Sequence, residues 1–479
     1  MKVRYVKINN KLAFSLVIIF IVGCLMTVTG AKSKIATYID NSNIGHANNY
    51  LIAVYQKMDD TIFLMSLRNK TKSGSMKGNK TVSNDCNYNK VLYTQMPKFR
   101  ESVGLSTHDM RNNVINKFPK ETYHVIRDDI DWSYVEKKKN EYTYDKYVKQ
   151  LKSYQKTGIK GQCIFTFNNP IYKHDGEKSD NVANIERVEA YKRFVLNFLR
   201  YMKSQDITGL YVEIINEPNI DIFFSSDEDF VKSYVDIVKS LYNEIKKIDE
   251  TAVVVTCNFA AGVGFSEAAL SDIDKALSYG IADYTDAISI HPYINGIPEK
   301  NIKLYEKMNY IVKEKYKEDI PIICGEFGYS ICEGKNYKKG YKILSTEQNR
   351  SEYIPRALLN NVRYGILITD IYCHRKTAED ASDNSEKLFG IYNMDGSPTE
   401  TALAIKKLVD EIGDMVYAGV YIDNGNYVVL QFIDEEGLVS YVGWSYDSSN
   451  DIELAGQYYT LTTKPTFIKG TGYQLRNAD

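Results

Sequence analysis

Two glutamates stand directly after short apolar runs of the kind that form buried strands. Glu217 follows the apolar residues up to 215 and precedes a proline, and Glu326 follows the run at 322–325. Because a residue before proline is held extended, Glu217 projects from its strand end instead of starting a helix. Glycoside hydrolysis requires two opposed carboxyl groups, one to protonate the departing oxygen and one to attack the anomeric carbon. Like charges at short range raise one of the two pKa values, which separates these roles.

The elements that must position these glutamates alternate between strand-like and helix-like segments from about residue 100. Apolar residues recur at spacings of three and four over 189–202 and 230–248, as in amphipathic helices. Eight strand–helix units over about 310 residues fit a (β/α)8 TIM barrel of the α/β class. A doubly wound open sheet is the alternative, although it rarely needs eight consecutive units. The candidate strands are 102–107, 123–128, 159–167, 209–215, 252–257, 287–291, 321–325 and 366–372.

Strand ends decide where the chemistry of such a barrel lies, because active sites gather at the carboxyl ends of the strands. Glu217 ends the fourth candidate strand and Glu326 ends the seventh, so both are expected at the same mouth. Either glutamate alone is readily explained as a solvated loop residue. Both together, at strand ends of one face, indicate a catalytic pair.

The Asn-Glu-Pro motif at 216–218 and the Gly-Glu-Phe-Gly motif at 325–328 together resemble clan A of the glycoside hydrolases, the retaining (β/α)8 enzymes. The run from Arg127 to Glu136 and the Gly-Ile-Lys at 158–160 are similar to family 39 and neighbouring family 5 proteins. The resemblance covers about residues 100 to 412, and a terminal sheet is common in family 39-like chains. The motif pair is specific for the clan and not for a sugar.

The resemblance implies roles for four side chains at the barrel mouth. Glu217 would be the general acid/base, and Glu326 the nucleophile that forms a covalent glycosyl-enzyme. Asn216 would hydrogen-bond the sugar 2-hydroxyl, and Arg127, expected to end strand two, would hold the nucleophile ionised. The plainer interpretation of Arg127 is an ion pair with one of the two aspartates that follow it.

Further polar residues are expected around the same mouth. His291 and Tyr293 in strand six resemble the clan's His-x-Tyr, which implies that Tyr293 donates to the nucleophile and that His291 lies near the acid/base. A satisfied core histidine is the plainer alternative. His108 follows strand one, and Asn168 and Asn169 follow strand three. All three are candidate partners of sugar hydroxyls, with structural roles in loops as the alternative.

Aromatic platforms for a sugar ring are expected at two places. Trp132, after strand two, is a candidate for stacking on a sugar, although a role as a core anchor is favoured. Clan A enzymes usually carry a Trp at the end of strand eight, whereas this chain has Tyr372-Cys373-His374 there. We expect Tyr372 or His374 to supply the platform instead.

The composition of the 479-residue chain is that of a globular protein, with 44% hydrophobic and 25% charged residues. Its 60 basic and 61 acidic side chains leave a net charge of −1, so there is no electrostatic footprint for nucleic acid. The 39 tyrosines suit sugar-lined clefts and ordinary surfaces alike. No Cys-x-x-Cys pair and no Cys/His cluster with zinc spacing occurs in the sequence, so we expect neither a metal nor a cofactor.

Residues 1–31 have the pattern of an export signal, in which basic residues precede an apolar run over 12–28. Three alternatives remain open: cleavage of a signal peptide near the small residues Gly30 and Ala31, retention as a membrane anchor, and lipidation at Cys24. All three predict an exported protein that is extracellular or held at the cell surface. Residues 32–97, rich in Asn, Lys and Ser, are expected to form a linker or stalk with a few short elements.

The period of the hydrophobic pattern changes to two after residue 412. Alternating runs are separated by turn residues, among them Asn424-Gly425, a strong hairpin signal. We therefore expect a catalytic (β/α)8 domain over 98–412 and a small antiparallel, β-sandwich-like domain over 413–479. The shortness of the second domain predicts that it packs on the barrel. Its candidate strands are 417–422, 427–432, 438–444 and 458–463.

These observations predict a retaining glycosidase that acts on a β-linked oligosaccharide or polysaccharide, with plant wall glycans and bacterial exopolysaccharides equally compatible. Rather short loops after strands one and two favour an open groove and endo cleavage. One alternative is a non-catalytic carbohydrate-binding protein of an exopolysaccharide system, which would typically have lost one carboxylate. Another is a barrel enzyme of different chemistry, disfavoured because no candidate strand ends in lysine and no phosphate-binding glycine loop occurs.

Overall fold

The computed structural model describes residues 97–107, 121–226, 228–262, 266–332, 345–378, 384–454 and 456–469. The expected export signal and stalk, as well as His108, lie outside these ranges. Within the described part of the chain, no helix is long and apolar enough to cross a bilayer.

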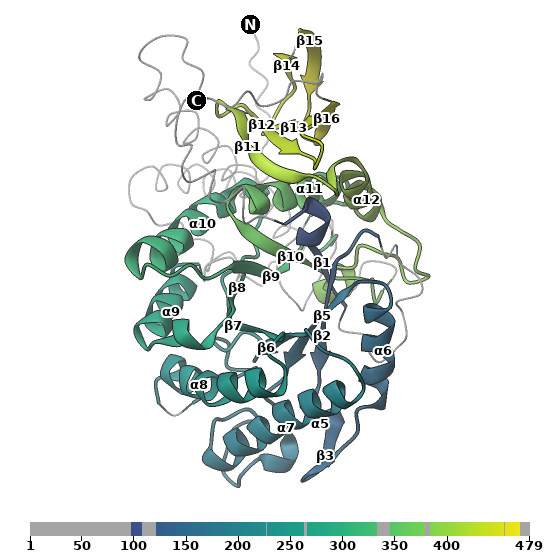
Figure 1. Cartoon of the computed structure of the whole chain (residues 1–479). Helices are drawn as coiled ribbons and strands as arrows, with labels where there is room; N and C mark the ends of the chain where they lie inside the picture. The colour runs from purple at the N-terminus through teal and green to yellow at the C-terminus, as the bar shows by residue number, and fades with distance from the viewer. Residues whose placement is uncertain are drawn as a thin grey trace, which may run out of the picture. The chain divides into compact units, whose positions relative to one another are not determined.

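A closed barrel of eight parallel strands forms the centre of the fold (Figure 1). The strands follow one another around the ring in chain order, and pairing of the first with the last closes it. The prediction of a (β/α)8 barrel is thereby confirmed. Its strands are β1 (Val103–Ser106), β2 (Val125–Ile130), β5 (Lys160–Phe165), β6 (Tyr211–Ile214), β7 (Val253–Ala260), β8 (Ala287–His291), β9 (Ile322–Phe327) and β10 (Ile366–Tyr372).

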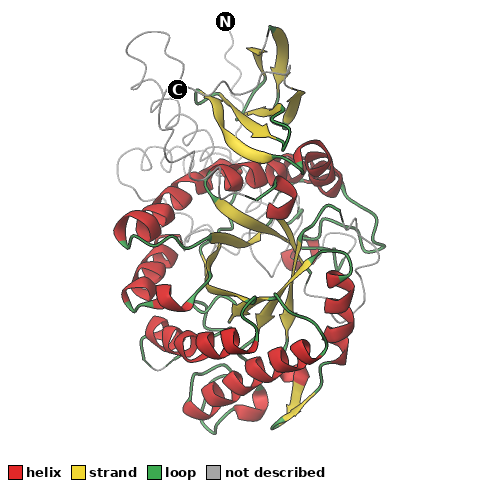
Figure 2. Ribbon diagram, in the orientation of Figure 1, coloured by secondary structure: helices red, strands yellow, loops and turns green. Residues whose placement is uncertain are grey.

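A ring of helices surrounds the strands (Figure 2), and the amphipathic pattern explains which face each helix buries. In α8, seven apolar side chains at helical spacing are buried against the barrel, each contributing about 1.5–3 kcal/mol. Asp229 caps this helix by accepting hydrogen bonds from the amides of Val231 and Lys232. The helices are α6 (Asp145–Gln155), α7 (Ile185–Ser204), α8 (Phe230–Ile248), α9 (Ser266–Ser278), α10 (Ile302–Asn309) with its π-helical extension η7 (Tyr310–Lys315), α11 (Glu347–Arg363) and α12 (Glu400–Ile412).

Short elements occupy the connections between strands and helices. A 3₁₀ turn precedes the first barrel strand, and a small hairpin lies between β2 and α6. These elements are η1 (Phe99–Ser102), α5 (Trp132–Val135), β3 (Glu136–Lys138), β4 (Glu141–Tyr142), η4 (Pro170–Tyr172), η5 (Ile281–Tyr284), η6 (Pro298–Asn301) and η8 (Ser385–Leu388).

Antiparallel strands follow α12, as the change of period predicted. Four of them form a sheet in the order β11-β12-β13-β16, and β14 and β15 form a hairpin. The stretch between the candidate strands 438–444 and 458–463 contains a further strand, β14, which begins at Asn450, because Ile452 and Leu454 pack against Leu461 in a small apolar cluster. The strands are β11 (Val416–Asp423), β12 (Tyr427–Ile433), β13 (Val439–Ser445), β14 (Asn450–Leu454), β15 (Gln457–Leu461) and β16 (Thr466–Lys469).

A buried ion pair ties this terminal sheet to the barrel. Glu299 of η6 accepts hydrogen bonds from Arg356 of α11 at 2.9 and 2.5 Å, and from the Trp444 indole of β13 at 3.0 Å. All three side chains are buried. Because each charged oxygen has donors, the cost of burying the pair is offset by its hydrogen bonds.

Candidate active site

The chain leaves β6 through two residues in the left-handed backbone region, Ile215 (φ 59°) and Glu217 (φ 40°), so the extended conformation expected for Glu217 before its proline was wrong. Such conformations cost about 1–3 kcal/mol each and persist only where the surroundings enforce them. Asn258 of β7 does so, since its side-chain amide donates to the carbonyl oxygens of Ile214 and Ile215, both at 3.2 Å. Its own carbonyl accepts from the Glu217 amide at 3.1 Å. The neighbouring strand thus fixes the direction in which Glu217 leaves the barrel.

Glu217 and Glu326 meet in the barrel mouth, as their strand positions predicted. Both are nearly buried, with 5% and 6% of their surface exposed. One carboxylate oxygen of each and a ring nitrogen of His291 lie within 4.8 Å of one another. Glu326 lies within β9 instead of following it, so the barrel itself holds this carboxylate.

Two donors surround the carboxylate of Glu326. Arg127 donates from Nη1 to Oε1 at 2.5 Å, and Tyr293 donates from its hydroxyl to Oε2 at 2.8 Å. Both contacts stabilise the charged form of the carboxylate. Arg127 was expected to end strand two, but β2 continues to Ile130, so the arginine projects into the barrel from within the strand.

Glu213 of β6 is the other partner of Arg127, and its role was not predicted from the sequence. Arg127 donates from Nε and Nη2 to the two oxygens of Glu213 at 2.7 and 2.5 Å. Burial lowers the pKa of the Arg127 guanidinium, but Glu213 and Glu326 outweigh burial and raise that pKa well above its ordinary value. Gln162 of β5 donates to Glu213 at 2.9 Å. The available signal was a single charged residue within the buried strand Tyr-Val-Glu-Ile.

His291 and Asn216 connect the two carboxylates to their surroundings. The buried His291 places Nδ1 3.0 Å from Oε1 of Glu217 and 3.9 Å from Oε2 of Glu326. Asn216 accepts from Arg127 Nη2 through Oδ1 at 2.9 Å. Its amide NH₂ group therefore remains to donate to a ligand in the cavity that Asn216 lines.

A cavity of about 280 Å³ opens in front of the carboxylate pair. Of the residues expected around a sugar, Asn168, Asn216, Tyr293 and Tyr372 line it. The structure adds side chains from β2 and from the loops after β5, β6 and β10, none of which was predicted from the sequence. These additional lining residues are Asp129, Thr166, Phe167, Ile222, Phe223, Glu386 and Phe389.

Three aromatic side chains lie at the end of strand eight, where the sequence lacks the Trp that is usual in clan A enzymes. Tyr372, Tyr293 and Phe389 contact one another edge to face, with ring centroids 5.2 to 6.1 Å apart. Burial and the charge of Glu326 raise the pKa of Tyr293 well above its ordinary value, so its hydroxyl remains a donor. His374, the other expected platform, is buried beside the Tyr392 ring at 5.3 Å.

Two residues expected to contact sugar are structural instead. Trp132 is completely buried, stacks on Phe194 at 5.6 Å and donates to Glu136 at 2.6 Å, so it is a core anchor and not a platform. Asn169 is also completely buried, and its side chain donates to the Glu136 carbonyl at 3.0 Å while capping η4. Trp132 is thus the core anchor that was favoured, packed against the aromatic side chains of α7, and the candidate sugar contacts of Trp132 and Asn169 were wrong because both side chains are completely buried.

The three groups Glu217, His291 and Glu326 are close enough for one metal ion to bridge them. Arg127, however, lies 2.5 Å from Glu326 and places a fixed positive charge against the carboxylate. That charge repels a divalent cation at short range. The surroundings therefore suit a carboxylate that meets an electrophilic carbon.

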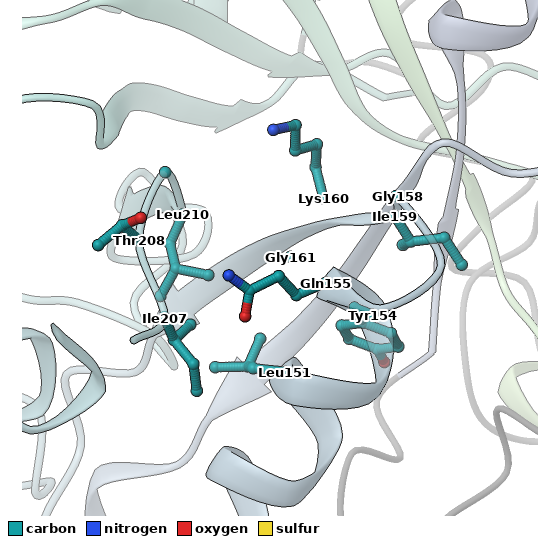
Figure 3. A pocket seen from close by; sticks show the side chains of 11 residues that line it. Leu151, Tyr154, Gln155, Gly158, Ile159, Lys160, Gly161, Ile207, Thr208 and Leu210 are labelled. Atoms are coloured by element: carbon teal, nitrogen blue, oxygen red, sulfur yellow. The ribbon is translucent and has the colours of Figure 1, made fainter. Parts of the chain in front are cut away.

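A second, smaller hollow of about 80 Å³ lies near the amino ends of β5 and β6 (Figure 3). Leu151 and Tyr154 of α6 face Leu210 across it, and Lys160 is the charged residue of its lining. The amino-terminal face of a barrel generally serves stability. The residues that line this hollow include no pair of groups for acid–base chemistry.

The fold is a closed (β/α)8 barrel, and a pair of buried glutamates lies at its mouth. No family model and no curated protein sequence matches the chain. The structure is similar to a family 39 glycoside hydrolase from the gut symbiont Bacteroides cellulosilyticus WH2, with a TM-score of 0.64 and 18% identity over 79% of this chain and 82% of that one.

Two further solved structures extend this likeness. A family 39 β-xylosidase from Caulobacter crescentus has a TM-score of 0.54 and 14% identity over 75% of this chain and 81% of that one. The endo-β1,6-glucanase BT3312 has a TM-score of 0.55 and 13% identity over 78% of this chain and 91% of that one. At the level of fold, the expected likeness to family 39 and clan A is therefore confirmed.

Proposed function

We propose that the protein is a retaining glycoside hydrolase that cleaves β-linked glycans by double displacement. The proposal is carried by the spacing of Glu217 and Glu326, which bring carboxylate oxygens within 4.8 Å of each other. Retaining glycosidases keep their carboxyl groups about 5–5.5 Å apart, whereas inverting enzymes leave about 6.5–9.5 Å for a water molecule. The short spacing supports direct attack on the sugar by a carboxylate.

Glu326 is the nucleophile in the first step. Its charge is stabilised by Arg127 and Tyr293, which donate to separate oxygens. As Glu326 forms a bond to the anomeric carbon, the bond to the leaving oxygen breaks and Glu217 transfers its proton to that oxygen. Asn216 donates to the sugar 2-hydroxyl, a contact that strengthens as the oxocarbenium-like charge develops.

The second step returns the enzyme to its starting state. Glu217, now ionised, takes a proton from a water molecule, which attacks the anomeric carbon and releases Glu326. Until that proton is taken, His291 Nδ1, 3.0 Å from Glu217, donates to the charged carboxylate and stabilises it. The two steps invert the anomeric carbon twice and so retain its configuration.

The substrate we propose is a β-linked oligosaccharide or polysaccharide met outside the cytoplasm. The amide, hydroxyl and aromatic groups of the cavity suit a sugar ring, which presents hydroxyls at its edge and C–H groups on its faces. The structural neighbours named above include a β-xylosidase and an endo-β1,6-glucanase, which supports β-linked substrates. The basic and apolar segment at 1–31 supports export.

A substrate panel with three variants tests the proposal. The purified chain is assayed for reducing ends on β-glucans, xylan, mannan and bacterial exopolysaccharides, beside Glu217→Gln, Glu326→Gln and the control Glu386→Gln. Glu386 also lines the cavity and has no role in the proposed reaction. We expect both catalytic variants to lose at least about 10³-fold in kcat and the control to remain within about tenfold.

The stereochemistry of the product decides the mechanism. Proton NMR during the first minutes should show the β-anomer accumulating before mutarotation. Accumulation of the α-anomer would refute retention while leaving hydrolysis intact. A folded protein that binds a glycan without cleaving it, with equal affinity in Glu326→Gln, would instead establish the carbohydrate-binding alternative.

A further inference from the structure

Asp370 of β10 is a carboxyl group enclosed in the barrel interior, and the proposed reaction does not use it. It is completely buried, and neither of its oxygens has a hydrogen-bond partner among the described residues. The chain leaves room for it, because a methyl group at Gly104 of β1 would collide with Asp370 Oδ1. A buried polar group without a partner is costly, so its protonation state needs an explanation.

The orientation of the adjacent Gln162 side chain is fixed by Glu213. Both oxygens of Glu213 accept hydrogen bonds from nitrogens of Arg127, so the Gln162 amide must turn its NH₂ group towards Glu213, at 2.9 Å. The Gln162 oxygen therefore points elsewhere, and within the described part of the chain it accepts no hydrogen bond. The Gln162 side chain is within hydrogen-bonding reach of Asp370. Two acceptor oxygens would repel each other there unless a proton lies between them.

We propose that Asp370 is a neutral carboxylic acid that donates its proton to Gln162 Oε1 and acts as a positioning residue for the nucleophile. The hydrogen bonds then run in one direction through the barrel. Asp370 donates to Gln162, Gln162 and Arg127 donate to Glu213, and Arg127 also donates to Glu326. The proton on Asp370 thus holds the amide in the orientation that keeps Glu213 and Arg127 in register with Glu326.

The charges around Asp370 agree with this assignment. Burial raises its pKa well above the ordinary value; Arg127 and the Gln162 side chain oppose the rise, and Glu213 and Glu326 add to it. The other titratable groups that interact with it are the Tyr211 hydroxyl and the thiol of Cys324, both neutral. An ionised Asp370 would give three buried carboxylates to one guanidinium. A neutral Asp370 leaves two, and Arg127 contacts both.

Infrared difference spectroscopy of the full chain tests the protonation directly. The measurement is made at pH 7 in the Glu217→Gln background, which removes the proton of the acid/base. We expect the C=O stretch of a protonated carboxyl group, shifting in heavy water, to vanish in Asp370→Asn. It should persist in the matched control Asp128→Asn, because Asp128 is a buried carboxylate that accepts from Thr107 and the Asp129 amide. Absence of the band, or its survival in Asp370→Asn, would overturn the proposal.

The positioning role is tested by the pH dependence of kcat/KM, an arm that rests on the proposed hydrolase function. Asp370→Asn keeps an N–H donor for Gln162, so we expect kcat/KM within about threefold of wild type and an unmoved acid limb. Asp370→Leu lacks a donor for Gln162, which loosens Arg127. We therefore expect the acid limb to move to higher pH by about half a pH unit, which is about a threefold loss of kcat/KM on the acidic side. Identical profiles of the two variants would refute the positioning role.

The two arms fail separately. The infrared band is measured without substrate. If the protein shows the band but has no activity, the protonation of Asp370 is retained and the hydrolase function is refuted. An active protein without the band does the reverse. Asp370→Ala replaces the leucine variant if that variant does not fold, with the same expected shift.

Discussion

Replacing Arg127 by lysine separates charge from geometry at Glu326. The guanidinium makes four hydrogen bonds, two to Glu213, one to Glu326 and one to Asn216. A lysine ammonium keeps the positive charge but is a compact donor that does not reproduce the fork. Because Glu213 holds two of the four hydrogen bonds, we expect the ammonium of Arg127→Lys to stay with Glu213 and to lose the bond to Glu326.

The size of the loss follows from that bond. A hydrogen bond to a charged group contributes about 1.5–3 kcal/mol, which corresponds to about a 10- to 150-fold fall in kcat/KM. The acid limb of the pH profile should also move to higher pH, since the ionised form of Glu326 loses a donor. Both quantities are measured with the best substrate of the panel, alongside thermal unfolding.

The matched control is Arg187→Lys, which alters a second completely buried arginine away from the cavity. Arg187 donates to the carbonyl of Tyr172 at 2.8 Å and to Glu177 at 3.0 Å. Its replacement should lower thermal stability without moving the pH profile. Wild-type kcat/KM in Arg127→Lys, or an equal shift of the acid limb in Arg187→Lys, would refute the reasoning.

Three further substitutions probe other parts of the structure. Trp444→Phe removes a donor from buried Glu299 and should lower the free energy of unfolding by about 1–3 kcal/mol in a denaturant titration; an unchanged midpoint would contradict this. Burial and the charge of Arg375 lower the pKa of His374 to about 4. As the pH falls below 6.5, this histidine is therefore protonated in the unfolded chain before it is protonated in the folded protein. Wild type should therefore lose about 1.4 kcal/mol of stability per pH unit between pH 6.5 and 4 relative to His374→Gln. Parallel curves of stability against pH for the two proteins would contradict this prediction. Ile222, 72% exposed on the cavity rim in the loop after Glu217, should contact the leaving group, so Ile222→Ser should raise KM about three- to tenfold at constant Tm. A KM that does not change would remove Ile222 from the site.

The sequence was sufficient for the barrel and its two carboxylates because both depend on local signals. Period-two and period-3.6 patterns identify strands and helices, and the end of a parallel strand fixes which face a residue reaches. Glu217 and Glu326 needed no knowledge of what lies opposite them. Three of the predicted elements, 230–248, 287–291 and 366–372, coincide with α8, β8 and β10.

What the sequence could not provide is the content of the barrel interior. Glu213 and Gln162 each stand in an apolar strand, and their roles arise only when β5 and β6 turn both inwards against Arg127. Trp132 was ambiguous for a similar reason, since the rings that bury it belong to α7 and η4, distant in the chain. Burial of this kind is a property of the assembled layers and leaves no local pattern.

The contact of Trp444 with Glu299 has a consequence for the evolution of the chain. Here the indole of β13 supplies a donor to a carboxylate that belongs to the barrel. A recombination that removed the sheet would leave the Glu299–Arg356 pair without that donor and open one side of it to water. Barrel and sheet are therefore expected to be inherited as one unit, with changes on either side of their boundary selected together.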